Sequence, residues 1–129
     1  MDTIEQIDEV ITWLKENEKS NNLVEICRKI DRLAVLSVSV AHDVSTAYSI
    51  MNELEDEYDI EFAKGISSSQ DSVAKAERKM EATLAEEKRL YTKAKNNYKK
   101  LDMYLDRIDR VIESYRQLVS VSKMDLKHG

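Results

Sequence analysis

The chain contains no proline and only two glycines, Gly65 and Gly129. Both residue types destabilise the interior of a helix, so their near-absence permits helices of unusual length. β-branched residues do not form the regular alternating runs, separated by turn signals, that strands need. A chain of 129 residues is also the size of one ordinary domain. The sequence therefore predicts an all-α protein with a single domain over residues 1–129.

Composition supports this class and bears on the cellular compartment. Charged residues make up 35% and apolar residues 42% of the chain, a balance typical of amphipathic helices rather than of a disordered chain. No apolar run approaches the roughly 20 residues that cross a bilayer, and the N-terminus lacks the features of a signal peptide. Cys27 is the single cysteine and cannot form an internal disulfide. We expect a cytoplasmic protein that makes no membrane contact.

Three residue pairs have the spacing of helix-start capping signals. They are Asp2 with Glu5, Asn22 with Glu25, and Ser68 with Asp71. We therefore expect helices at about 3–18, 23–63 and 69–125. The segment KGISSS (64–69) is the expected second turn, with Gly65 in the left-handed conformation that ends many helices.

Apolar side chains recur at alternating spacings of four and three residues. This pattern runs from Met80 to Val119 in the third predicted helix and from Val40 to Tyr58 in the second. A repeat of 3.5 residues keeps one apolar seam on one side of a helix. The segment 35–42 alternates like a strand, but it would have no strand partner, so we expect a helix there too. The pattern predicts a long antiparallel coiled-coil hairpin with a short N-terminal helix.

The short turn also predicts which residues face each other. In an antiparallel pair joined at 64–68, facing residues have numbers that add up to about 133. The acidic segment 52–61 should then lie opposite about 72–81, which carries Lys75, Arg78 and Lys79. The charge distribution favours such pairing. Residues 1–70 carry 6 basic and 15 acidic side chains (−9), and residues 71–129 carry 14 and 10 (+4).

The same register leaves residues 112–125 without a partner from the second helix. This overhang carries four candidate interface residues, Ile112, Tyr115, Leu118 and Val119. Such an apolar stripe is unstable in water, so either the first helix folds alongside it or a second chain covers it. We expect self-association, most simply as a C2 dimer, together with a protein partner.

The segment KRLYTKAKNNYKK (88–100) is a candidate phosphate-binding surface. Its basic residues, called the basic face below, are Lys88, Arg89, Lys93, Lys95, Lys99 and Lys100. Tyr91 and Tyr98 lie on the seam and should pack on Val40, Val44 or their neighbours. Because the predicted neighbour 33–45 holds only one acid, the basic face is either a solvated surface or a contact for single-stranded nucleic acid or a nucleotide.

Other residues do not form a catalytic or metal-binding pattern. His42 has no second histidine near it, Cys27 has no reactive context, and Trp13 is most simply a packing residue. The spacing is that of exposed helix pairs rather than of a metal site for Asp102, Asp106 and Asp109 with Arg107 and Arg110. We expect no enzymatic activity, no cofactor and no metal.

Part of the chain resembles short helical proteins encoded by tailed bacteriophages. The resemblance covers about residues 47–126, and the matching positions are Ala47, Tyr48, Glu57, Tyr58, Ala76, Tyr91, Tyr98, Leu118, Ser122, Lys123 and Asp125. It implies a phage origin, location in the host cytoplasm and a non-enzymatic accessory role. Such proteins are often encoded near replication and recombination genes.

These observations lead to one leading hypothesis and two alternatives. The leading hypothesis is a helical protein-interaction or adaptor protein, as an accessory to phage DNA replication or recombination. The first alternative is phosphate binding at the basic face. The second is an inhibitor of a host defence protein.

Overall fold

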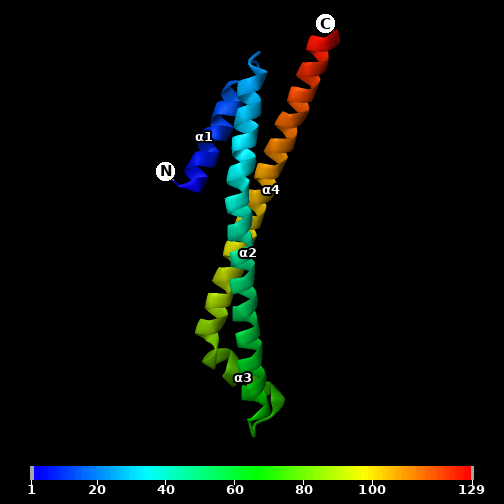
Figure 1. Ribbon diagram of the computed structural model, residues 1–129. Helices are drawn as coiled ribbons and strands as arrows, with labels where there is room; N and C mark the ends of the chain where they lie inside the picture. Colours follow the sequence, from blue (N-terminus) through cyan, green and yellow to red (C-terminus); the bar gives the residue numbers. More distant parts are fainter. Residues whose placement is uncertain (1, 129) are drawn as a thin grey trace. The chain divides into compact units, whose positions relative to one another are not determined.

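The computed structural model describes the backbone of residues 2–128 and the side chains of residues 2–125. Within that part of the chain there are four α-helices and no strand (Figure 1). They are α1 (Thr3–Glu16), α2 (Leu23–Ser67), α3 (Val73–Thr83) and α4 (Ala85–His128). The all-α prediction is confirmed, and α2 packs against α4 as an antiparallel helical hairpin. The alternating segment 35–42 is helical throughout.

The first two predicted helix starts are confirmed by their caps. The Asp2 carboxylate accepts a hydrogen bond from the Glu5 backbone N–H at 2.8 Å. The Asn22 side-chain oxygen accepts one from the Glu25 backbone N–H at 3.2 Å. Each bond satisfies an N–H group that the first helical turn leaves without a partner.

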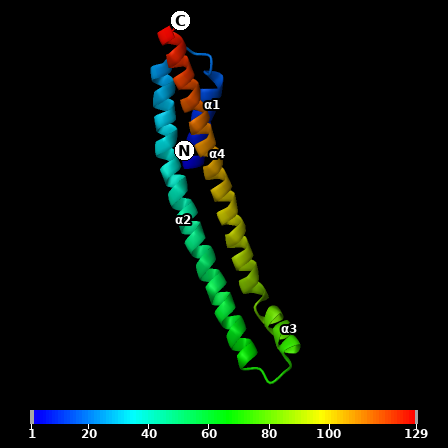
Figure 2. The same cartoon turned by 90° about the vertical axis from the view of Figure 1, so that its right-hand side faces the viewer.

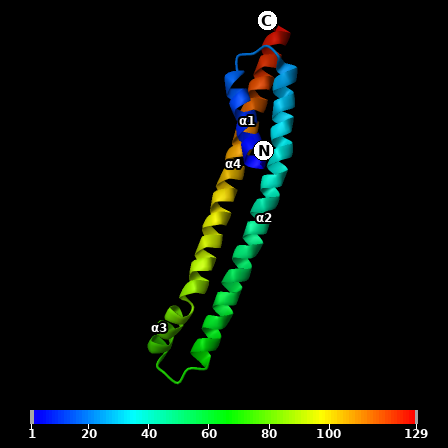
Figure 3. The same cartoon turned by 90° about the vertical axis from the view of Figure 1, so that its left-hand side faces the viewer.

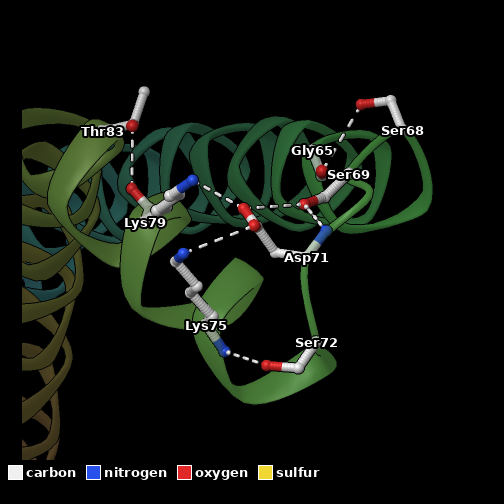
Figure 4. Close-up of polar contacts among 8 residues, drawn as sticks. All are labelled: Gly65, Ser68, Ser69, Asp71, Ser72, Lys75, Lys79 and Thr83. Atoms are coloured by element: carbon white, nitrogen blue, oxygen red, sulfur yellow. Dashed lines mark hydrogen bonds and ion pairs between the residues drawn. The ribbon is translucent and has the colours of Figure 1, made fainter.

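The third predicted start is wrong, because the connection after α2 lies further along the chain. Ser72 caps α3 and accepts a hydrogen bond from the Lys75 backbone N–H at 3.4 Å (Figure 4). Asp71, just before it, accepts from the Lys79 ammonium at 2.6 Å and pairs with Lys75 at 3.6 Å. These contacts, the hydrogen bond from Lys79 above all, hold the pKa of Asp71 below its usual value.

Gly65 does not end α2, contrary to the prediction. The helix continues through it to Ser67, and no described glycine has a positive φ. A Cβ atom at this position would collide with the Met80 side chain. The missing side chain of Gly65 therefore leaves room for the flexible Met80 side chain of α3 against α2, which is a different use of the glycine.

The third predicted helix is interrupted at Leu84, so α3 and α4 are separate helices (Figure 2). The Thr83 hydroxyl donates to the Lys79 carbonyl at 2.8 Å, a back-bond that commonly bends a helix. The Leu84 side chain is buried beside this break. Glu86 and Glu87 then occupy the first turn of α4, where negative charge suits the helix N-terminus.

The contacts of the described chain divide it into two compact units. Unit 1 comprises Met1–Asp43 and Leu101–Gly129, and unit 2 comprises Val44–Lys100. In unit 1, α1 lies alongside the N-terminal part of α2 (Figure 3). The buried apolar side chains of unit 1 are Ile7, Val10, Leu14, Ile26, Ile30, Leu33, Leu36, Val40, Ile108, Ile112, Tyr115 and Val119. Three helices thus enclose one core in this unit.

In unit 2, the observed pairing of α2 with α4 differs from the predicted register. The predicted register put Tyr98 opposite about residue 35, and its ring was expected on Val40, Val44 or their neighbours. It packs instead on Tyr48, with ring centroids 5.2 Å apart. Tyr91 contacts Glu55 at 3.4 Å. The longer α2 and the connection to Ser72 account for about half of this shift, because a turn centred near residue 70 moves facing residues by only about one heptad.

One further property of α2 concerns membranes. The helix contains an 18-residue stretch of mean hydropathy 1.2, long and apolar enough to cross a bilayer by these two criteria alone. Core helices of other proteins meet the same criteria, so this is weak support for a span. The expected absence of membrane contact stays a prediction.

Candidate binding surfaces

Three of the four candidate interface residues are buried by the chain itself. Ile112, Tyr115 and Val119 lie in the core of unit 1, and only Leu118 is half-exposed. Val119 shares a depression with Ile30 of α2, so the predicted overhang of α4 is wrong. The shifted register brings α2 alongside this stripe. The first helix also folds alongside it, which is the first of the two arrangements predicted from the sequence. These three side chains are not free for a second copy.

The Tyr115 hydroxyl fixes this arrangement through a contact that the sequence did not predict. It donates a 2.7 Å hydrogen bond to the Glu18 carboxylate, just after the C-terminal end of α1. Burial and this carboxylate raise the pKa of Tyr115 far above its ordinary value. Tyr104 makes a longer contact of 3.4 Å with Asp8, so two tyrosines of α4 hold α1.

The basic face lies on α4 within unit 2. Four of its six cations line one open depression of about 670 Å³. The lining residues are Ala85, Lys88, Arg89, Thr92, Lys93, Asn96, Asn97 and Lys100. Lys99 is exposed outside the depression and Lys95 is half-buried. The depression combines cations with amide and hydroxyl groups, all of which can bind phosphate oxygens.

Several cations of the basic face already have partners. The Arg89 guanidinium donates two hydrogen bonds to Glu86, at 2.9 and 2.6 Å, and holds the pKa of that carboxyl below its usual value. The Lys88 ammonium lies 5.1 Å from the Tyr58 ring centroid and 5.5 Å from that of Tyr91. Lys93 and Lys100 are the lining cations most open to a ligand.

The acidic segment 52–61 lies opposite this part of α4 rather than opposite 72–81. Glu55 contacts Tyr91, and burial together with this carboxylate raises the pKa of Tyr91. The predicted neighbour of the basic face, 33–45, is therefore wrong, and an acidic segment of α2 takes its place. Tyr91 and Tyr98 do lie on the seam as predicted, half-buried and turned toward α2. Their rings are not placed to stack nucleic-acid bases on the outer side.

The remaining candidates have ordinary environments. His42 is exposed, and Cys27 is a half-buried free thiol. Trp13 is half-buried, with the Lys29 ammonium 5.2 Å from its ring centroid. Asp106 pairs with Arg110 at 2.9 Å, as the spacing predicted. Among the described residues, no cluster of three or more histidines, cysteines or carboxylates is arranged to hold a metal ion.

A second surface, not identified from the sequence, lies on α2 in unit 1. We call it the α2 outer stripe, and its residues are Val24, Asp31, Val35, Val38 and His42, all exposed. Val35 is 63% and Val38 67% exposed. Successive members are seven, four, three and four residues apart, and seven residues are two turns of the repeat. These side chains therefore follow the 3.5-residue period of a helix-packing seam. The buried side of α2, with Leu33 and Val40, is on the opposite face.

The described residues therefore define an all-α helical-hairpin protein whose candidate sites are exposed helix faces rather than an enclosed pocket. Comparison with known protein families, with curated proteins and with solved structures finds no match.

Proposed function

We propose that the chain is a non-enzymatic helical protein-interaction protein that binds a partner helix along the α2 outer stripe. The observation that carries this proposal is the pair of exposed valines, Val35 and Val38, on a seam with coiled-coil spacing. A stripe with that period that carries three exposed valines beside Asp31 and His42 fits a second helix, whose knobs would enter the holes between its side chains. The resemblance to phage proteins supports the further proposal of an accessory role in phage DNA replication or recombination.

The partner interaction is tested with the double variant Val35→Lys/Val38→Lys. Both side chains are exposed, so we expect the free energy of unfolding to change by less than about 1 kcal/mol. Affinity purification from the producing cell should recover a stoichiometric protein partner with the unaltered chain. Recovery should fall about tenfold or more with the variant, because charges would replace the apolar contact.

A matched control is Val73→Lys on α3, since Val73 is 65% exposed and lies off the stripe. Its partner recovery should equal that of the unaltered chain. If the double variant retains its partner, or if no stoichiometric partner is recovered with the unaltered chain, the proposed role of the stripe is wrong.

A second candidate function is phosphate binding at the basic face, and the depression lined by Lys93, Lys100 and two asparagines favours it. A labelled single-stranded oligonucleotide should bind at low salt. With three or four phosphate contacts, its affinity should fall roughly 20- to 50-fold between 50 and 200 mM salt. Lys93→Glu/Lys100→Glu should abolish binding, whereas Lys15→Glu/Lys19→Glu should lower it only slightly. An absence of binding at low salt would eliminate this candidate.

A further inference from the structure

Unit 2 has a thin core for its length. Its buried apolar side chains are only Ala47, Met51, Ala76 and Leu84, and two of these are alanines. Helices in water depend mainly on packing of an apolar face, and these four residues bury little apolar surface. Meanwhile Ile50 is 48% and Leu90 41% exposed.

Ile50 and Leu90 lie on the same side of the hairpin. Each directly precedes a seam residue, Met51 on α2 and Tyr91 on α4. In two antiparallel right-handed helices, the position before a facing residue projects to the same side. Leu54 lies four residues after Ile50, and Ala94 lies four residues after Leu90. Both are half-buried and extend the apolar surface that Ile50 and Leu90 begin. We call the four apolar residues the side face.

Charged and polar residues border the side face on both helices. On α2, Glu53 lies three residues after Ile50 and Glu57 seven residues after it. On α4, Lys93 and Asn97 lie three and seven residues after Leu90. All four side chains are exposed. More broadly, residues 44–67 of α2 carry six acids and one base, and residues 85–100 of α4 carry six bases and two acids. The two long helices of unit 2 therefore present opposite charges.

These charges select one of the two symmetric ways in which two hairpins can stack face to face. A two-fold axis perpendicular to the helix axes, in the plane of the interface, would place α2 on α2, with acid against acid. A two-fold axis along the helices places α2 of each copy on α4 of the other, with Glu53 near the level of Lys93. Like charges in contact cost stability and opposite charges fix the register.

We propose that the side face of unit 2 binds a second copy of this chain, with α2 of each copy antiparallel to α4 of its partner. The resulting four-helix arrangement covers Ile50, Leu54, Leu90 and Ala94 in both copies. This dimer goes beyond the proposed function, because the α2 outer stripe lies in unit 1. Either proposal can therefore fail alone.

The test is a charge-exchange experiment on the full chain by light scattering at tens of micromolar. The unaltered chain should have about twice the monomer mass of 14.9 kDa. Glu53→Lys/Glu57→Lys alone, and Lys93→Glu/Asn97→Glu alone, should each return a mass near 14.9 kDa, since like charges then meet at both contacts. An equimolar mixture of the two variants should recover the doubled mass, because opposite charges meet again between different chains.

Asp56→Lys/Asp59→Lys is the matched control, with the same charge change on the other side of α2, and it should remain dimeric. Circular dichroism of each variant verifies that the helices are intact. A monomeric unaltered chain overturns the proposal. So does a dimer that survives both side-face variants, which would place the interface elsewhere, and so does a mixture that stays monomeric.

Discussion

Replacing Ile108 by alanine should destabilise unit 1 by about 2–5 kcal/mol. Ile108 is fully buried, at 0% exposure, in the core formed by α1, α2 and α4. Truncation removes apolar contacts and leaves a cavity that close-packed neighbours refill only in part. The free energy of unfolding can be measured by urea denaturation. The fluorescence of Trp13, the single tryptophan, reports on unit 1.

Val38→Ala is the corresponding control, because Val38 is an exposed aliphatic residue in the same unit. Its effect should stay within about 0.5 kcal/mol. Equal losses for Ile108→Ala and Val38→Ala would mean that the core of unit 1 is not where the structure places it.

Removing the Tyr115 hydroxyl by Tyr115→Phe should cost about 1.5–3 kcal/mol near neutral pH. The variant leaves the Glu18 carboxylate without its 2.7 Å donor and loosens the hold of α4 on the end of α1. Urea denaturation measures the loss. Tyr104→Phe is a matched control that should cost less, because the contact of Tyr104 with Asp8 is longer, at 3.4 Å.

The Tyr115 contribution should also decrease at alkaline pH. Because the folded chain raises the pKa of Tyr115, the unfolded chain loses this proton first, above about pH 10. The native state then binds more protons than the unfolded state, so the free energy of unfolding falls as pH rises. The contribution is complete below pH 10 and shrinks above it. The stability difference between the unaltered chain and Tyr115→Phe should therefore be smaller at pH 11 than at pH 9, and a difference that grows would contradict the assigned hydrogen bond.

Helical class and the first two helix starts could be predicted because they depend on local chemistry. Without proline and with few glycines, nothing in the chain opposes long helices, and Asp2 and Asn22 each cap a neighbouring backbone N–H. The break at Leu84 was missed. Its local signal was Thr83, whose hydroxyl can bond back to the preceding turn.

The register of the hairpin could not be predicted, so the environment of both candidate sites could not be predicted either. A seam that repeats every seven residues still matches apolar to apolar after a shift of whole heptads, and the observed register differs by about two of them. That shift put α2 beside Val119 and the acidic segment 52–61 beside the basic face. It removed the overhang.

The sequence by itself determined that this chain forms long amphipathic helices folded back on one another, because backbone propensity and the 3.5-residue repeat act within a few residues. Only the tertiary structure decided which turns of those helices meet, that Ile112 and Tyr115 are buried, and that Val35, Val38 and Ile50 stay exposed. Those outcomes depend on contacts between residues far apart in the chain, where many registers bury similar apolar area and differ only in side-chain fit and charge.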